Sequence, residues 1–124
     1  MRALTRAIKP EQRLIVVGAI SLLQYDETSL RREHQDSRLA EHVYYPIIDH
    51  SANWTLLQHN PCDWTLVCPP LIVDGPPSDD YSTCSDYWPA GAAHKIAVGV
   101  VGRFIANEID QRAFTRVRVG SGAA

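Results

Sequence analysis

The run at residues 63–70, DWTLVCPP, constrains the fold of this chain more than any other stretch. Its middle part, residues 64–68, is rich in strand-forming types and apolar nearly throughout, as in a parallel strand that is covered on both faces. The two prolines end the strand because proline has no N–H to donate to a sheet ladder. Ligands of open α/β sheets bind just beyond the carboxyl ends of strands, so residues 69–74 are the first place to look for a site.

Composition narrows the class of protein. A chain of 124 residues is large enough for one domain, which we expect to span residues 1–124. The net charge of −2 and pI near 6.2 give no reason to expect nucleic acid or an anionic membrane as a partner. No apolar run approaches the roughly 18 residues of a membrane span, and there is no signal-peptide core. We expect a soluble, cytoplasmic protein.

Cysteines and histidines do not predict a metal site. The three cysteines show no Cys-x-x-Cys spacing, and reduced thiols are the expected state. None of the five histidines is four residues from another, as a helical zinc site requires. Asp49 and His50 could form an acid–base pair, but adjacent residues of a helix point in different directions. A capping charge and a packed imidazole are the simpler interpretation.

A second buried strand is predicted at residues 13–17, RLIVV, and Gly18 closes it. A strand ending in glycine can open a dinucleotide-binding loop, but Gly18 is followed by AISLL, and the other glycines of that loop are missing. The glycine-rich pyrophosphate cradle is not found elsewhere in the chain either. Upstream, residues 1–9 have helical spacing, and Pro10 ends that helix.

The middle of the chain predicts a charged loop followed by a helix. Residues 24–41 are charged and poorly periodic, typical of a solvated loop with some helix near its end. Pro46 suits the first helical position, and the helix should end near His59. Its buried stripe is expected to be formed by side chains spaced three or four residues apart. These are Ile47, His50, Trp54 and Leu57.

The last third alternates again between strand and helix. Residues 81–88 are expected to be irregular or briefly extended, and residues 96–109 a helix whose apolar face, from Ile96 to Ile109, covers a sheet. Gly99 and Gly102 would allow that helix to approach the sheet closely. Residues 114–119 predict a short strand, with the final SGAA as a frayed tail. This order predicts crossover units and a mostly parallel sheet, with strands 13–17 and 64–68 as neighbours.

Three segments carry a family resemblance: RLIVVGAISLL, DHSANWTLLQHNPCDWTLVCPPLIVDGPPSDDY and HKIAVGVVGRFIANEID. They resemble the C-terminal half of the atypical, NmrA-like short-chain dehydrogenase/reductases, which are single-domain NAD(P)H-binding Rossmann proteins. Within that group the likeness is greatest to flavin reductases of the biliverdin-IXβ-reductase type. The residues in step with that pattern are Asp49, His50, Trp64, Pro69, Pro70, Asp74, Pro76 and Tyr81.

The resemblance implies a fold and a binding site. The fold is an α/β, three-layer Rossmann-type parallel sheet without the N-terminal nucleotide-binding half. Gly18 and Ala19 would line the nicotinamide ribose of NAD(P)H. A second segment would pass beside the nicotinamide, mostly through backbone groups, and consists of Pro69, Pro70, Leu71 and Ile72. The alternative interpretation is that the two prolines simply end a strand, and no catalytic side chain is identified.

Several positions depart from the family pattern. A serine of the family falls at Ala19, a histidine falls at Leu71, and a serine and an aspartate fall at Ala97 and Val100. The half with the glycine-rich loop and the residue that selects NAD or NADP is expected to be absent. The resemblance therefore implies NAD(P)H-dependent hydride transfer to a flavin or similar small-molecule acceptor, impaired in this chain and with weak cofactor binding. The alternative is a non-catalytic remnant or interaction module.

The same resemblance has a consequence for association. In a doubly wound sheet, the strand at residues 13–17 lies between this chain's strands and those of the N-terminal half. Its outer edge is then unpaired and apolar, which favours pairing with another chain. We therefore expect self-association, or a complementing N-terminal half as partner.

Overall fold

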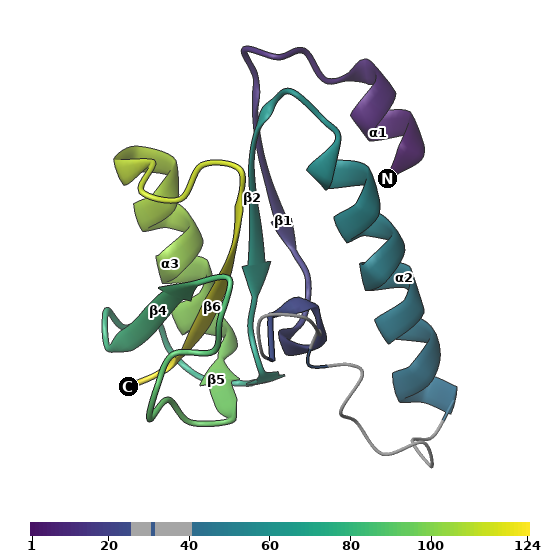
Figure 1. Cartoon of the computed structure of the whole chain (residues 1–124). Helices are drawn as coiled ribbons and strands as arrows, with labels where there is room; N and C mark the ends of the chain where they lie inside the picture. The colour runs from purple at the N-terminus through teal and green to yellow at the C-terminus, as the bar shows by residue number, and fades with distance from the viewer. Residues whose placement is uncertain (26–30, 32–40) are drawn as a thin grey trace.

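A four-stranded sheet lies at the centre of the molecule, in the order β1-β2-β6-β4 (Figure 1). The computed structural model describes residues 1–25, 31 and 41–124, apart from the side chains of residues 41–45 and 47. The strands are β1 (Arg13–Val17), β2 (Asp63–Cys68), β6 (Val117–Ala123) and β4 (Tyr81–Ser85). β1, β2 and β6 run parallel, and β4 runs antiparallel to β6. A separate parallel pair is formed by β3 (Leu71–Val73) and β5 (Lys95–Ala97).

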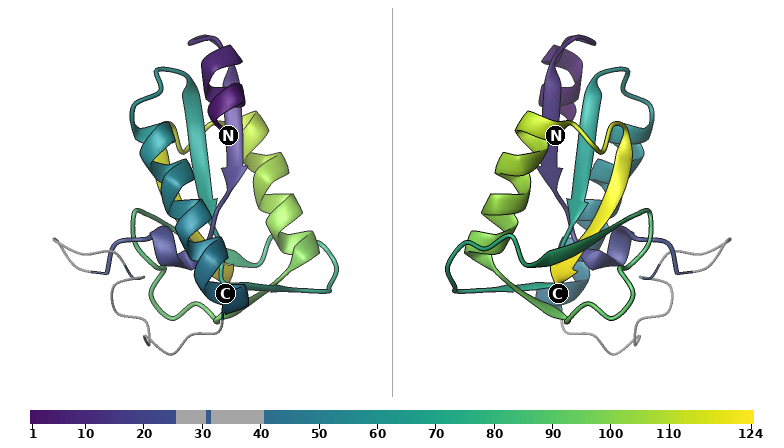
Figure 2. Two further views of the ribbon diagram at one scale, coloured as in Figure 1. Left: turned by 90° about the vertical axis from the view of Figure 1, so that its right-hand side faces the viewer. Right: turned by 90° about the vertical axis from the view of Figure 1, so that its left-hand side faces the viewer.

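Helices cover both faces of the sheet. They are α1 (Arg2–Ala7), the short 3₁₀ helix η1 (Ile20–Leu22), α2 (Glu41–Gln58) and α3 (Val98–Gln111). Figure 2 shows α2 on one side of the sheet and α3 on the other. The predicted three-layer α/β architecture of Rossmann type is therefore confirmed, although the antiparallel β4 was expected only as irregular or extended chain. No described helix is both long enough and apolar enough to cross a membrane.

The central strand β2 explains why its sequence is continuously apolar. Leu66 and Cys68 pack on the α2 side with Leu22 and Leu57, while Val67 packs on the α3 side with Phe104 and Val119. All of these side chains are at most 2% exposed. Both faces of the strand are covered, and alternation between apolar and polar residues is therefore lost.

α2 begins earlier than its sequence predicted. The helix starts at Glu41, so Pro46 lies inside it and not at its first position. A proline in the second turn removes one backbone hydrogen bond, which an otherwise well-packed helix can tolerate at some cost. Of the expected stripe, Leu57 is fully buried, and His50 and Trp54 are half-buried. Ile47 lies outside the side chains that are described, and most of the predicted loop at residues 24–41 lies outside the described residues.

α3 begins later than expected and is rotated. Its predicted first residues form β5, which pairs with β3, and neither short strand was predicted from the sequence. The buried face holds Val100, Val101, Phe104 and Glu108, whereas Ile109 is 58% exposed. The prediction that Ile109 faces the sheet was wrong because Glu108 takes the inward position, where it meets Arg13.

The two glycines of α3 do not serve helix–sheet packing. A Cβ on Gly99 would lie 2.4 Å from the Pro76 carbonyl carbon, so Gly99 is required where a loop crosses the helix. A Cβ on Gly102 would meet nothing within 4 Å. The expectation of close contact with the sheet was therefore wrong for both residues.

The end of the described chain is an interior strand and not a frayed tail. β6 extends to Ala123 between β2 and β4, and Ser121 is fully buried. A Cβ on Gly120 would lie 2.4 Å from the Tyr87 carbonyl oxygen, so only glycine fits there. The prediction of a strand at 114–119 was thus shifted, because small residues were interpreted as a loose end.

Candidate functional site

The carboxyl ends of β1 and β2 lie side by side, as the sequence predicted. Val17 pairs with Val67, and the Gly18 N–H donates to the Val67 carbonyl over 2.7 Å. One step further, the Ile20 N–H donates to the Pro69 carbonyl over 3.0 Å. The structure therefore brings the two segments of the predicted cofactor site into direct contact.

Gly18 allows the chain to turn away tightly from β1. It is buried, and a Cβ at this position would lie 3.0 Å from both Leu22 and Leu66. Ala19 then caps η1, and its carbonyl accepts a hydrogen bond from Leu22 N–H over 3.0 Å. The carbonyls of Ala19 and Pro69 thus each accept one hydrogen bond within the protein, which fixes η1 against the end of β2.

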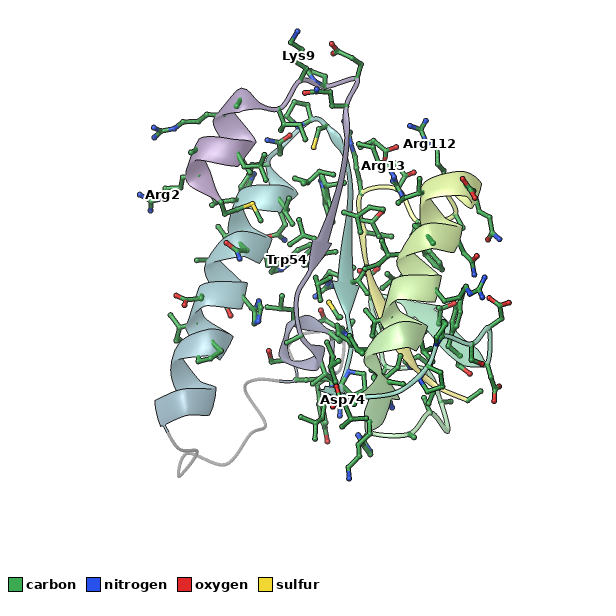
Figure 3. The ribbon with its side chains drawn as sticks, turned by 180° about the vertical axis from the view of Figure 1, so that it is seen from behind. Arg2, Lys9, Arg13, Trp54, Asp74 and Arg112 are labelled. Atoms are coloured by element: carbon green, nitrogen blue, oxygen red, sulfur yellow. The ribbon has the colours of Figure 1, made fainter. Side chains whose placement is uncertain are left out.

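The segment after β2 passes from buried to exposed within two residues. Pro69 and Pro70 are buried, whereas Leu71 is 62% exposed and Ile72 is 41% exposed. β3 holds these two apolar side chains in place through its pairing with β5. In Figure 3, Asp74 marks this end of the molecule and Arg13 the opposite end of β1. The result is a fixed apolar rim at the carboxyl end of the sheet.

The thiol nearest the rim is not a nucleophile. Burial raises the pKa of the Cys68 thiol to about 12, and the Arg118 guanidinium and Ala19 N–H offset only part of that shift. Cys68 is therefore a protonated thiol at neutral pH and not a nucleophile. The described residues contain no cluster of three His, Cys, Asp or Glu side chains that could hold a metal ion.

Two features near this end were not predicted from sequence. The Ser21 hydroxyl, two residues after Ala19, is buried and has no hydrogen-bond partner among the described residues. Arg118 contacts η1 through its guanidinium, which donates to the Leu22 carbonyl over 2.8 Å. The same guanidinium pairs with Asp86 at 3.2 Å and lies 4.5 Å from the Trp54 ring centroid. An arginine in a strand that was predicted to be short gave no signal of such a role.

The positions where the family places polar groups on the late helix are apolar here and closed. Ala97 ends β5 and provides no side-chain cap for α3, and Val100 is buried. The Gly99 N–H donates to the Gly75 carbonyl over 3.2 Å, so the loop 75–77 covers the start of the helix. The N-terminus of α3 is therefore not available to an anion.

A charged cluster occupies the opposite, amino end of the parallel strands. Arg13 bonds Asp63 at 2.6 Å and Glu108 at 2.8 Å, and Glu108 also accepts from the Phe114 N–H over 2.8 Å. Glu108 is 2% exposed. Because every charge in it is paired inside the protein, the cluster ties α3 and the chain before β6 to β1 and β2.

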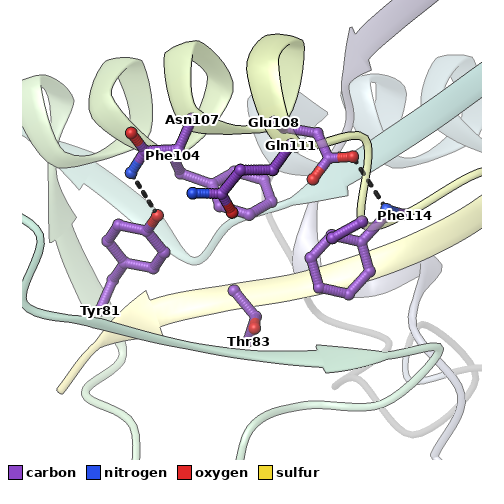
Figure 4. A pocket seen from close by; sticks show the side chains of 8 residues that line it. Tyr81, Thr83, Phe104, Asn107, Glu108, Gln111 and Phe114 are labelled. Atoms are coloured by element: carbon purple, nitrogen blue, oxygen red, sulfur yellow. Dashed lines mark hydrogen bonds between the residues drawn. The ribbon is translucent and has the colours of Figure 1, made fainter.

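A hollow of about 260 Å³ lies between β4 and α3, beside this cluster. Figure 4 shows Tyr81 and Thr83 of β4 facing Phe104, Asn107 and Gln111 of α3, with Phe114 closing one end. The Asn107 amide donates to the Tyr81 hydroxyl over 2.8 Å. The hollow is distant in sequence from the predicted cofactor segments, and none of those segments lines it.

Comparison with solved structures supports the fold. A proposed NADH-flavin reductase from Streptococcus pneumoniae superimposes with a TM-score of 0.79 at 19% identity, over 99% of this chain and 61% of that one. A short-chain dehydrogenase/reductase from Veillonella parvula, solved with NADP, gives 0.68 at 19% identity, over 98% and 54%. A proposed NAD-dependent epimerase/dehydratase from Bacillus halodurans gives 0.70 at 15% identity, over 98% and 50%.

These likenesses show the fold alone. The chain has the Rossmann-type α/β fold that these solved structures share. It spans between half and about three-fifths of the length of each of these three structures. No protein-family model and no curated protein matches the chain.

Proposed function

We propose that this chain forms the part of an NAD(P)H-dependent reductase that holds the nicotinamide end of the cofactor beside a flavin or similar planar acceptor. The observation that carries the proposal is the contact between residues 18–20 and Pro69, at the carboxyl ends of two adjacent parallel strands. That is where ligands bind in open α/β sheets.

The residues present fit one end of the cofactor better than the other. Gly18, Ala19 and the two buried prolines give a close, rigid floor, and Leu71 and Ile72 give an apolar wall for a flat ring. For the pyrophosphate, the start of α3 is covered, and no glycine-rich loop follows β1. We therefore expect NADH or NADPH to bind with a Kd no better than about 1 mM, which corresponds to a binding free energy of roughly 4 kcal/mol.

The proposed hydride transfer needs no reactive group on a protein side chain. The bound cofactor supplies the hydride. Leu71 and Ile72 would exclude water from the ring and help to orient the acceptor, and η1 would fix the position of Ala19. Since no titratable side chain is needed at the rim, the alanine at position 19 and the leucine at position 71 need not abolish hydride transfer, although we expect it to be slow.

The test is a pair of matched substitutions assayed with NADPH and FMN, following the loss of the reduced nicotinamide. Leu71→Asp places a charge on the proposed wall, and we expect it to lower turnover at least about tenfold. Ile109→Asp is the control, because Ile109 is similarly exposed at 58% but lies near the far end of α3. Equal effects of the two substitutions would contradict the proposed site.

A non-catalytic role is the second candidate. It is favoured by the apolar residues at Ala19, Leu71 and Val100, where the resembling reductases have polar groups. A chain that is folded by circular dichroism, yet shows no NADPH oxidation above the protein-free rate at several millimolar cofactor, would select this alternative. The fold would then act as an interaction module.

A further inference from the structure

β1 is an edge strand with an open outer side. In the described part of the chain its only strand partner is β2, and in Figure 3 no other described element crosses it between α2 and α3. Natural edge strands are usually blocked by lysine, proline, a bulge or an inward charge. β1 has no lysine or proline, and its one charge, on Arg13 at its first residue, is turned inward to Asp63 and Glu108. The other four residues are Leu14, Ile15, Val16 and Val17, so most of the strand carries no such block. Its outer edge is therefore ready to pair with another strand.

Two hydrogen bonds to β2 determine which backbone groups of β1 face outward. The Gly18 N–H donates to Val67, and the Gln12 carbonyl accepts from Asp63 over 3.2 Å, so both residues direct their backbone toward β2. Backbone groups alternate in direction along a strand. The outward groups are consequently those of Arg13, Ile15 and Val17.

This set of outward groups is symmetric about Ile15. In an antiparallel pair of identical strands, Arg13 would lie opposite the partner's Val17 and Ile15 opposite the partner's Ile15. All three residues would then form hydrogen-bonded pairs, giving about six bonds in total. A parallel pair of the same two edges needs a one-residue offset, which no two-fold axis can provide. The edge is thus complementary to itself only in the antiparallel sense.

The charge and shape of the β1 edge are also compatible with the binding of a second copy of this chain. Arg13, the single charged residue of the strand, is already paired with Asp63 and Glu108, so two edges would not repel each other. Next to Arg13 lies a hollow of about 330 Å³ lined by Leu4, Ala7, Ile8 and Gln12. In the antiparallel register, the chain that follows the partner's Val17 would pass this hollow.

We propose that two copies of this chain associate through β1, in an antiparallel pair centred on Ile15, to form one continuous sheet. This surface is distinct from the rim proposed to hold the nicotinamide, and its test does not depend on cofactor binding. A strand from a complementing nucleotide-binding half is the competing occupant.

Cross-linking tests the register. In a Cys84→Ala background the two remaining cysteines are buried. Ile15→Cys should form a disulfide-linked dimer on mild oxidation, because hydrogen-bonded antiparallel partners have Cα atoms about 5.5 Å apart, within disulfide range. Val17→Cys is the control on the same strand and face. It is 40% exposed, but its copies would be offset by roughly 14 Å along the strands and should not cross-link.

Sedimentation tests the association itself. The unmodified chain should sediment as a dimer, and Ile15→Lys should raise the dimer dissociation constant at least about tenfold by placing like charges opposite each other. A monomer at high concentration, with Ile15→Cys and Val17→Cys equally inert, would overturn the proposal. So would a dimer that cross-links through Val17→Cys and not through Ile15→Cys. A monomer whose Ile15 and Val17 amides resist hydrogen exchange would identify another occupant of the edge, and would overturn it as well.

Discussion

The two ends of the parallel strands differ in how they are built. At the amino end, Arg13, Asp63 and Glu108 form a closed ion cluster that joins two strands to α3. At the carboxyl end, Gly18 bonds to Val67 and Ile20 bonds to Pro69, and the exposed side chains of Leu71 and Ile72 are apolar. The buried ion cluster thus lies at the amino end, whereas Leu71 and Ile72, which are proposed to face the cofactor, are uncharged.

This difference separates structure from chemistry. A buried carboxylate is stable only when it is paired and hydrogen-bonded, and Glu108 satisfies that requirement through Arg13 and the Phe114 N–H. The Glu108 charge is therefore fully paired within the fold. The apolar side chains of Leu71 and Ile72 need no such partners, and they suit a reaction in which the bound cofactor, and not a protein side chain, carries the reactive group.

The largest effect is expected at the amino end. Glu108→Ala leaves the half-buried Arg13 guanidinium with one partner and removes the acceptor of the Phe114 N–H, so it should lower the free energy of unfolding by about 3–5 kcal/mol. The measurement is equilibrium unfolding in urea. Asp110→Ala, an exposed carboxylate two residues along the same helix, should change it by less than about 0.5 kcal/mol. Similar losses for both variants would show that the cluster does not fasten this end.

A smaller loss is expected from crowding near the carboxyl end. Gly120→Ala would push a methyl group to within 2.4 Å of the Tyr87 carbonyl oxygen, and it should cost about 1–3 kcal/mol. Gly102→Ala meets nothing within 4 Å, and in a helix it should stabilise by about 0.5–1 kcal/mol. Thermal unfolding of the two variants side by side distinguishes these signs. If Gly120→Ala were neutral, close packing would not be what holds this end.

The smallest effect is expected in the pH dependence of the free energy of unfolding. The pKa of Cys68 is raised to about 12 from 9.0, so the folded chain holds this proton more tightly than the unfolded chain. The resulting stability is fully present below pH 9 and is lost as the pH rises toward 12. At pH 10 the loss should be about 1.4 kcal/mol. Unfolding free energies measured between pH 8 and 10 should decline less in Cys68→Ala than in Cys84→Ala, and parallel declines would contradict the assignment.

The sequence was most informative where a strand is covered on both faces. The apolar runs of β1 and β2 predicted two adjacent parallel strands, and hence that the segments after Val17 and after Cys68 lie side by side. The sequence was least informative where tertiary contacts determine whether a residue is buried. The segment around Gly120 looks like a loose end until the Tyr87 carbonyl is placed against it. Likewise Glu108 looks like a solvent-facing charge until Arg13, which is 95 residues away in sequence, is placed beside it.

The most direct test is a titration of the ¹⁵N-labelled chain with NADPH, followed by amide chemical shifts. If the carboxyl end holds the nicotinamide, the amides of Gly18, Ala19, Leu71 and Ile72 should shift together, with a Kd of about 1 mM or weaker. The amides of Arg13 and Glu108 should stay in place. Saturable shifts centred instead on Tyr81 and Gln111, which line the hollow between β4 and α3, would contradict the proposed site. Micromolar affinity would show that the pyrophosphate is held by groups outside residues 18–19 and 69–72.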